Sequence, residues 1–165
     1  TRRNGRLPDG GGASGGGRGY VSVLGGSWEI EQRRSQAAQR QITLQLHGVD
    51  STGPWEGGLV ELAISNLLQN ALDFAPSGSS IDIALKPHGI TIRDQGPGVP
   101  DALLSRLGER FFTTARPNGE RSGTGLGLSI VTRIMHLHGG SMRICNMAPG
   151  LAVTLDFSSP SQQLV

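Results

Sequence analysis

The sequence predicts an α+β fold in which helices cover one face of a mixed, mainly antiparallel sheet. Apolar residues recur with helical spacing over residues 59–75 and 126–137. Polar and apolar residues alternate in two pairs of short segments, within 81–92 and 142–157, as they do in β-hairpins. Separate strand pairs mixed with helices favour the α+β class.

The N-terminal segment, residues 1–26, is dominated by glycine, arginine and serine. Such a composition buries little apolar surface, so we expect a flexible linker or a non-native remnant without chemistry of its own. We expect the globular domain to span residues 27–158 and residues 159–165 to form a C-terminal tail. A chain of 165 residues has room for one domain with a real core.

The predicted elements follow one another in the order helix, strand, helix, hairpin, loop, helix, hairpin. Ser27 can cap the first helix, and Pro76 and Gly78 end the second. The predicted ranges are a helix at 27–40, a strand at 42–46, a helix at 59–75, strands at 81–85 and 90–92, a turn-rich loop at 94–100, a short helix at 101–107, a polar loop at 108–124, a helix at 126–137, and strands at 142–145 and 152–157. The loop at 108–124 is long enough to act as a lid over a functional site.

Charge and composition exclude several classes of function. The net charge is +2, and the basic residues are scattered without aromatic interleaving, so nucleic-acid binding is not expected. No apolar run approaches the roughly 18 to 20 residues that span a bilayer, so we expect a soluble chain without membrane contact of its own. Cys145 is the one cysteine, which excludes an intrachain disulfide and is compatible with a reducing compartment.

A first group of polar residues lies on one face of the helix predicted at 59–75. Asn66, Asn70 and Asp73 are spaced i, i+4 and i+7, so they share that face. An amide oxygen suits Mg²⁺, which combines a few protein oxygens with phosphates and waters. Taken alone, the pattern fits a solvated helix face better than a metal site.

A second group, Asp94-Gln95-Gly96-Pro97-Gly98, directly follows a predicted strand. A carboxylate at a strand end can accept a hydrogen bond from an exocyclic amine such as that of adenine. Glycines at 96 and 98 would let the backbone approach a flat ring closely. A plain turn explains the same residues slightly better when they are taken alone.

A third group, Gly123-Thr124-Gly125-Leu126-Gly127, opens the helix predicted at 126–137. Alternating glycines before a helix offer unblocked N–H groups for phosphate. The lysine of a P-loop is missing, and a polar loop stands where a dinucleotide fingerprint needs a strand. A merely flexible helix start is the less favoured alternative.

Four stretches together resemble the nucleotide-site motifs of histidine kinases, in the order and spacing of that family. They are Asn66-Leu67-Leu68-Gln69-Asn70-Ala71, Asp94-Gln95-Gly96-Pro97-Gly98, Glu109-Arg110-Phe111-Phe112 and Gly123-Thr124-Gly125-Leu126-Gly127-Leu128-Ser129-Ile130. The resemblance covers about residues 40–158. It implies the Bergerat-type ATP-binding fold, a two-layer α/β sandwich shared with gyrase, Hsp90 and MutL. Residues 70–76 and 116–122 also look like the CreC-type sensor kinases.

The resemblance implies roles for individual residues. Asn70 would bind Mg²⁺, Asn66 would support it or contact phosphate, and Asp94 would read the adenine amine. The other implied contacts are Gly96 and Gly98 at the base, Gly123, Thr124, Gly125, Leu126 and Gly127 at the phosphates, Phe111 and Phe112 as anchors of the lid, and Thr154 near the base. A strand-favouring role for Thr154 is equally compatible with the sequence.

Asp73 departs from the family pattern, because many histidine kinases have a cation at this position. A carboxylate cannot neutralise phosphate, although it can hold Mg²⁺ or a water. The lid offers Arg110 and Arg116 as candidate catalytic cations, with Arg121 as a further one. A solvated lid charge is an equal alternative for each of them.

The four histidines, His47, His88, His136 and His138, all lack the setting of a phosphoacceptor and are expected to be structural or solvent-facing. The resemblance therefore implies that the acceptor histidine lies on a separate dimerisation domain of a longer kinase. ATP, that domain and a response regulator are the implied partners. The full-length protein would be anchored in the inner membrane, with this part in the cytoplasm.

Three functions compete at this point. The first is a kinase module that transfers the ATP γ-phosphate to a histidine. The second is an ATPase of the gyrase or Hsp90 kind, or a serine kinase of the anti-sigma type. Such relatives have a general-base glutamate where this chain has Asn66, whose amide cannot take a proton. The third is a non-catalytic nucleotide-binding scaffold.

Overall fold

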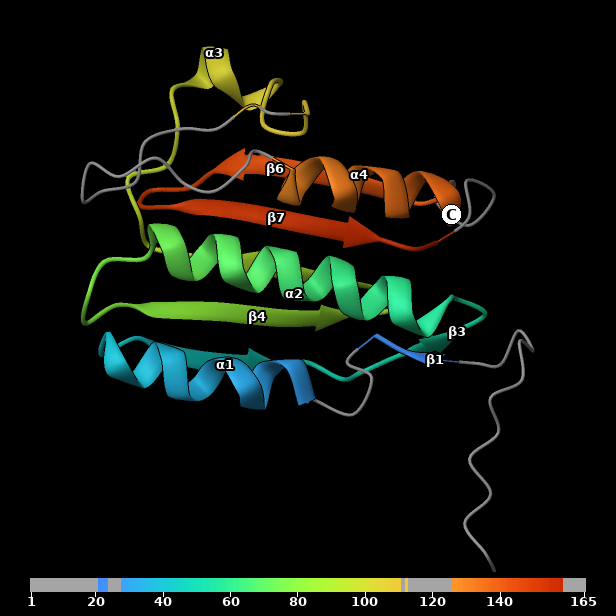
Figure 1. Cartoon of the computed structure of the whole chain (residues 1–165), viewed down its shortest axis with the longest axis horizontal. Coiled ribbons are helices and arrows are strands. Elements are labelled where there is room, and N and C mark those ends of the chain that lie inside the picture. Colours follow the sequence, from blue (N-terminus) through green and yellow to red (C-terminus); the bar gives the residue numbers. More distant parts are fainter. Residues whose placement is uncertain (1–20, 24–27, 111, 113–125, 159–165) are drawn as a thin grey trace, which may run out of the picture.

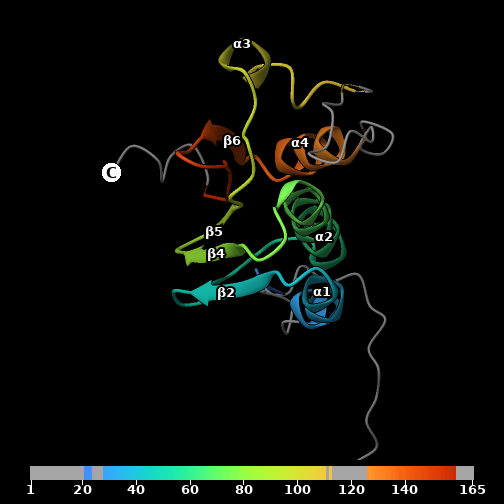
Figure 2. The same ribbon diagram turned by 90° about the vertical axis from the view of Figure 1, so that its left-hand side faces the viewer.

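The computed structural model describes residues 21–23, 28–110, 112 and 126–158. It shows two layers, a five-stranded sheet and a layer of helices on one of its faces (Figures 1 and 2). The helices are α1 (Trp28–Gln39), α2 (Gly57–Phe74), α3 (Asp101–Leu104) and α4 (Gly127–Leu137); the strands are β1 (Val21–Ser22), β2 (Thr43–His47), β3 (Thr52–Gly53), β4 (Ser80–Lys86), β5 (Gly89–Arg93), β6 (Ser141–Asn146) and β7 (Leu151–Asp156). The predicted α+β class is confirmed.

The strands of the main sheet are arranged in the order β2-β4-β5-β7-β6. Strand β2 is parallel to β4, and every other neighbouring pair is antiparallel, so the sheet is mixed as predicted. The parallel pair requires a crossover, which α2 provides. Since β4 and β5 run in opposite directions, the β4–β5 turn and the end of β5 lie at opposite ends of the sheet.

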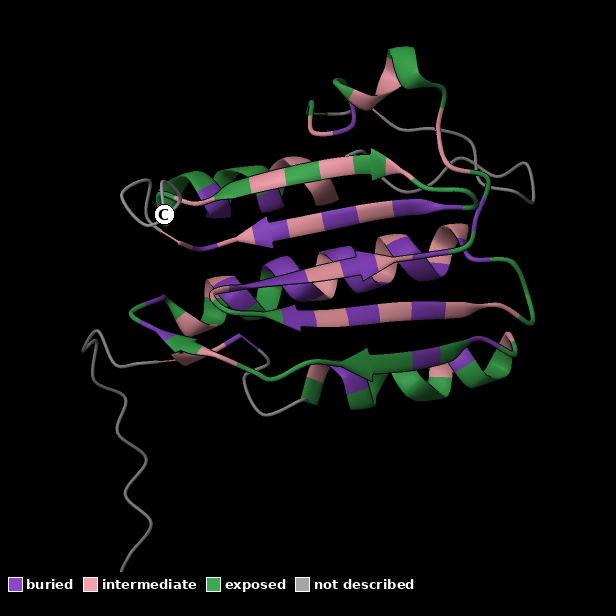
Figure 3. Ribbon diagram, turned by 180° about the vertical axis from the view of Figure 1, so that it is seen from behind, coloured by how far each residue is buried: buried purple, intermediate pink, exposed green. Residues whose placement is uncertain are grey.

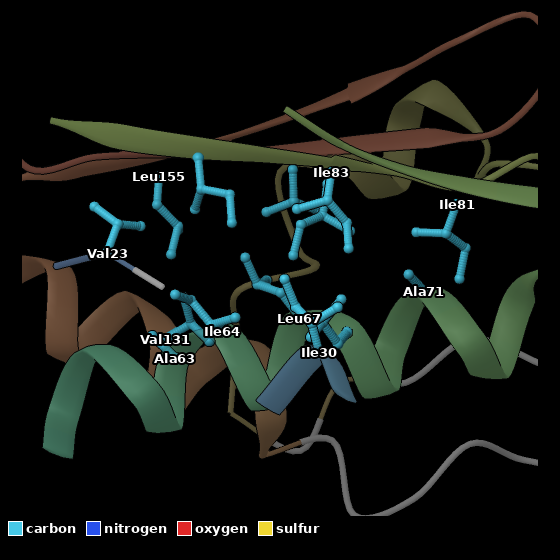
Figure 4. Close-up of a cluster of buried hydrophobic side chains, with 14 of the residues drawn as sticks. Val23, Ile30, Ala63, Ile64, Leu67, Ala71, Ile81, Ile83, Val131 and Leu155 are labelled. Carbon is cyan, nitrogen blue, oxygen red and sulfur yellow. The ribbon is translucent and has the colours of Figure 1, made fainter. Parts of the chain in front are cut away.

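The core lies between the sheet and the helices, and period-two alternation along the strands builds it. Figure 3 shows buried and partly buried residues alternating along β4, β5 and β7, while the edge strand β2 is largely exposed. The inward residues include Ile81, Ile83 and Leu155, which point toward Leu67 and its neighbours on α2 (Figure 4). Full burial of such a side chain contributes about 1.5–3 kcal/mol.

Helix α2 receives a cap at each end from outside the helix. At the start, the Glu56 carboxylate accepts a hydrogen bond from the backbone N–H of Leu59 at 2.7 Å. At the end there is no basic residue in the last turn, and the Arg40 guanidinium of the preceding segment donates to the carbonyls of Leu72 and, at 2.8 Å, Ala75. This cation offsets the partial negative charge of the helix C-terminus.

The folded domain includes residues that we expected to belong to a flexible segment. Strand β1 pairs antiparallel with β3, with Val21 opposite Gly53, and the side chain of Val23 is fully buried. The apolar stretch Tyr20-Val21-Ser22-Val23-Leu24 is short, and glycine-rich sequence on both sides hides it in a composition typical of a linker. Ser27, the predicted cap of α1, lies outside the described residues.

Other differences between expectation and structure are small. Helix α2 begins two residues earlier than predicted, at Gly57, because Glu56 caps it. Helix α3 is shorter than predicted and ends at Leu104, where turns follow. Among the described residues, no helix is long and apolar enough to cross a membrane.

Candidate functional site

Described parts of the three predicted groups lie close together: the loop after β5, the C-terminal half of α2 and Gly127 at the start of α4. The elements approach so closely that a β-carbon in place of a glycine hydrogen would touch the neighbouring element. A β-carbon on Gly127 of α4 would lie 3.3 Å from the Asn66 amide oxygen of α2. A β-carbon on Gly96, after β5, would lie 2.6 Å from the Phe74 carbonyl oxygen at the end of α2.

Asp94 is a buried carboxylate at the centre of this arrangement, with 4% of its surface exposed. Its Oδ1 accepts hydrogen bonds from the backbone N–H groups of Gly96 at 2.8 Å and Leu151 at 3.4 Å. Burial raises the pKa of this carboxyl, while those hydrogen bonds and the nearby charge of Arg93 oppose the shift. The site thus contains a desolvated acceptor for a neutral or cationic N–H donor.

The loop after Asp94 needs glycine for reasons of space and backbone conformation. A β-carbon on Gly96 would collide with the Phe74 carbonyl and would also lie 2.9 Å from Asp94 Oδ1. Gly98 has φ +68°, and a β-carbon there would lie 2.6 Å from the Asn146 amide oxygen. The loop therefore packs between the end of α2 and the end of β6.

The polar face of α2 carries Asn66, Asn70 and Asp73, as predicted. The Asn66 amide nitrogen donates to the Leu62 carbonyl at 2.9 Å, and its oxygen is the atom that faces Gly127. Asp73 Oδ1 accepts a hydrogen bond from Gln69 Nε2 at 3.0 Å. The carboxylate at the position where a cation is usual is thus held by a neighbouring amide.

Arg33 of α1 supports this face and was not identified from the sequence. Its guanidinium donates to Gln69 Oε1 at 2.7 Å and to Ser65 Oγ at 2.6 Å. Because Gln69 accepts from Arg33 with its oxygen, its nitrogen is left to donate to Asp73. No local spacing could reveal this chain of contacts, since Arg33 and Gln69 lie on different helices.

The start of α4 contributes backbone donors. Its N-cap residue Leu126 makes no side-chain cap, and the Ser129 hydroxyl donates to the Leu126 carbonyl at 2.8 Å rather than accepting from the helix. The first N–H groups of α4 are therefore not capped by either side chain. The predicted phosphate contacts Gly123, Thr124 and Gly125 lie outside the described residues.

The segment that leads toward the predicted lid is described only in part. Arg106 forms an exposed pair with Glu109, at 3.2 Å, and its guanidinium lies 4.4 Å from the centre of the Phe112 ring. Arg110 is exposed. Phe111, Arg116 and Arg121 lie outside the described residues.

Thr154 does not join the other site residues. Its hydroxyl lies 2.9 Å from that of Thr91, and both residues occupy strand positions that alternate with the buried, helix-facing ones. Both hydroxyls therefore project from the face of the sheet opposite to the helices. Leu151 is the β7 residue that contacts Asp94, through its backbone.

The histidines lie away from this end of the sheet. His138, at the end of α4, accepts a hydrogen bond from the Glu56 N–H at 3.0 Å through Nε2. Its Nδ1 lies 2.8 Å from the Ile134 carbonyl, and its ring packs edge-on against Phe157. His138 thus joins the end of α4 to the start of α2, in the structural role that was predicted.

The chain is similar in sequence to one family of ATPases and to individual sensor proteins. A family profile described as "Histidine kinase-, DNA gyrase B-, and HSP90-like ATPase" matches residues 57–161. The sensor protein QseC of Salmonella typhi is 42% identical over 117 residues, which are 70% of this chain and 25% of QseC. The sensor protein CreC of Escherichia coli K12 is 36% identical over 124 residues, 73% of this chain and 26% of CreC.

A solved structure agrees with these relatives. The mycobacterial sensor histidine kinase MprB superimposes with a TM-score of 0.68 at 26% identity, over 84% of this chain and 95% of that one. The chain belongs to the histidine kinase-, DNA gyrase B- and HSP90-like ATPase family. Within the family it corresponds to the catalytic ATP-binding domain of a sensor histidine kinase, and it spans about a quarter of the length of QseC and CreC.

Proposed function

We propose that this domain binds MgATP at the Asp94 end of the sheet and transfers the γ-phosphate to a histidine on a separate dimerisation domain of the same full-length kinase. The buried Asp94 carboxylate carries this proposal. A desolvated acceptor beside a glycine loop suits the amine and the flat ring of adenine. Backbone N–H groups of Gly96 and Leu151 already hold its Oδ1, so the carboxylate is fixed in place for a further donor.

The phosphates of the nucleotide and the bound Mg²⁺ would lie against helices α2 and α4. Asn70, with Asn66 beside it, would hold Mg²⁺, and the start of α4 would donate N–H groups to the phosphates. Among the described residues there is no cluster of three or more histidines, cysteines or carboxylates that could form a metal cage. A single amide ligand fits Mg²⁺, which takes its other ligands from phosphates and water. Mg²⁺ would neutralise phosphate charge, and Arg110 and Arg116 are the candidate cations for the transferred group.

The wider setting follows from the same proposal. A phosphorylated histidine on the dimerisation domain would pass its phosphate to a response regulator. The described histidines make structural contacts or face solvent, so the acceptor would be supplied by another part of the kinase. We propose that the full-length protein is anchored in the inner membrane, with this domain in the cytoplasm.

The test has a binding step and a transfer step. Calorimetric titration with MgATP should show saturable binding to the wild-type domain and a loss of at least about tenfold in affinity for Asp94→Asn, whose amide nitrogen would face the adenine amine. Gln45→Glu, an exposed change on β2, serves as the control and should bind like the wild type. Absence of MgATP binding by a folded sample would refute the proposal.

Transfer separates a kinase from a scaffold. With an added acceptor hairpin from a related kinase and labelled ATP, we expect phosphohistidine from the wild type and far less from Asn70→Ala. Binding without any transfer would indicate a nucleotide-binding scaffold. Since Asn66 cannot act as a general base, we also expect negligible hydrolysis of ATP by the domain alone. Steady hydrolysis that is lost in Asn70→Ala would favour an ATPase instead.

A further inference from the structure

We infer that Asn146, the last residue of β6, is a positioning residue that holds the loop after Asp94 in place and thereby sets selectivity for the adenine base. This inference rests on the proposed function. Asn146 lies outside every motif considered in the sequence. It acts on the site through the backbone of Val99, rather than by touching the nucleotide itself.

The side-chain amide of Asn146 pairs with the loop as a neighbouring strand would. Its Oδ1 accepts from the Val99 N–H at 3.0 Å, and its Nδ2 donates to the Val99 carbonyl at 2.5 Å. Nδ2 also donates to Asp101 Oδ1 at 2.8 Å, at the start of α3. Turning the amide over would place like groups together at all three contacts, so the orientation is unambiguous.

One pair of opposite residues in the β6–β7 hairpin holds the loop at two points. Asn146 is paired with Leu151 in the register of the two strands. The Leu151 N–H donates to the Asp94 carboxylate, and the Leu151 carbonyl accepts from the Asp94 N–H at 3.1 Å. Leu151 thus holds the beginning of the loop through its backbone groups, while Asn146 holds the end of the loop through its side chain.

Gly98 shows how closely the amide fits the loop. A β-carbon at Gly98 would lie 2.6 Å from Asn146 Oδ1, so glycine leaves the space that the amide occupies. On the other side, Gly96 rests against the end of α2. The short stretch between Asp94 and Val99 is therefore confined on one side by α2 and on the other by Asn146.

Loss of the Asn146 amide would release the end of the loop and leave Asp94 attached through Leu151. The carboxylate would remain, but the surface beside it would no longer be fixed. The proposed contacts to phosphate come from α2 and the start of α4, which Asn146 does not hold. We therefore expect discrimination between bases to weaken more than binding of the triphosphate.

Two variants test this inference. Asn146→Asp keeps the shape of the side chain but sets a carboxylate oxygen against the Val99 carbonyl and Asp101, while Asn146→Ser removes the amide without adding charge. Affinities for ATP and for inosine triphosphate, which lacks the exocyclic amine, are measured by calorimetry with Mg²⁺. The ATP-to-inosine-triphosphate ratio should fall several-fold in both variants, in line with the loss of about one or two hydrogen bonds. Gln32→Glu on α1 is an amide-to-acid control that should keep the wild-type ratio.

The ratio distinguishes positioning from a structural role, because partial unfolding lowers both affinities by the same factor. Amide hydrogen exchange gives a second readout that needs no nucleotide. In Asn146→Ser the Val99 amide should exchange at least about tenfold faster, with the Leu151 amide unchanged. An unchanged ratio in both variants, with wild-type binding intact, overturns this inference alone. A wild-type domain that binds no ATP overturns the proposed function together with it.

Discussion

At the scale of single residues, the burial of one carboxylate makes the site sensitive to pH. The pKa of Asp94 is raised, so the folded protein binds this proton more tightly than the unfolded chain does. The free energy of unfolding contributed by this group therefore falls as pH rises from the usual carboxyl range through the raised pKa. The ionised form is the stronger acceptor, so a nucleotide amine favours it.

We accordingly predict that ATP affinity rises across the pH interval in which Asp94 of the free domain loses its proton. Titrations from the usual carboxyl range upward to neutral pH measure this dependence. Asp94→Asn is the reference variant. The phosphates of ATP also lose protons in this pH range, and the variant keeps the pH dependence that they cause but lacks the contribution of Asp94. Identical pH profiles for the wild type and the variant would show that Asp94 does not govern the effect.

Gly150 provides a second prediction at this scale. It has φ +100°, and a β-carbon there would lie 1.9 Å from the Asp94 carbonyl oxygen. We predict that Gly150→Ala lowers the free energy of unfolding by more than about 3 kcal/mol. Gly78→Ala is a matched control, since Gly78 has φ +81° and nothing within 4 Å of such a β-carbon. Gly78→Ala should cost only about 1–2 kcal/mol, from backbone strain. Chemical denaturation of both variants checks the difference, and equal losses would rule out the collision with Asp94.

At the scale of elements, helix α1 and the residue that follows it, Arg40, supply positive charge to α2. Arg33 contacts the side chains of Ser65 and Gln69, and Arg40 caps the final turn. Helix α2 has no basic residue in its last turn and carries Asp73 there, which the macrodipole disfavours. The packing of α1 therefore compensates for an unfavourable feature of its neighbour.

We predict that Arg33→Met, which keeps most of the apolar stem, lowers the free energy of unfolding by about 1–3 kcal/mol, because Gln69 and Ser65 lose a charged donor. The adjacent Arg34 is the control. It pairs with Glu31 at 2.9 Å, but both side chains are about half exposed, so Arg34→Met should change stability by less than about 1 kcal/mol. Urea unfolding measures both variants, and equal effects would contradict the role given to Arg33.

Periodicity predicted the elements well where one face is buried, as along β4, β5 and α2. Glycine at 96 and 127 allows the loop after Asp94 and the start of α4 to approach α2 closely, whereas Gly123, Thr124 and Gly125 lie outside the described residues. Contacts between distant elements could not be predicted in this way. Arg33, Asn146 and the backbone of Leu151 act across the fold, and only the strand register and helix packing bring them to the site. For Thr154 the resemblance offered a contact near the base, with a strand-favouring role as the equal alternative, and strand alternation turns its hydroxyl to the face opposite to the helices.

At the scale of the whole molecule, residues near the N-terminus belong to the folded domain. Strand β1 pairs with β3, and Val23 is completely buried. We predict that Val23→Ala lowers the free energy of unfolding by about 1–3 kcal/mol through loss of buried methyl groups. Val49→Ala, at a side chain that is 83% exposed, should change it by less than about 0.5 kcal/mol. Similar midpoints of unfolding for the two variants would place residues 21–23 outside the cooperative unit.

The position of β1 has a mechanical consequence. Ser51, beside β3, hydrogen-bonds to the β4–β5 turn, so β1 lies at the end of β5 opposite to Asp94. Chain that precedes Val21 therefore joins the domain one strand length from the site, about 17 Å for five residues. A rotation of the domain about Val21 by about 30° would carry the Asp94 end through an arc of about 9 Å. The displacement of a bound group would therefore grow with its distance from Val21.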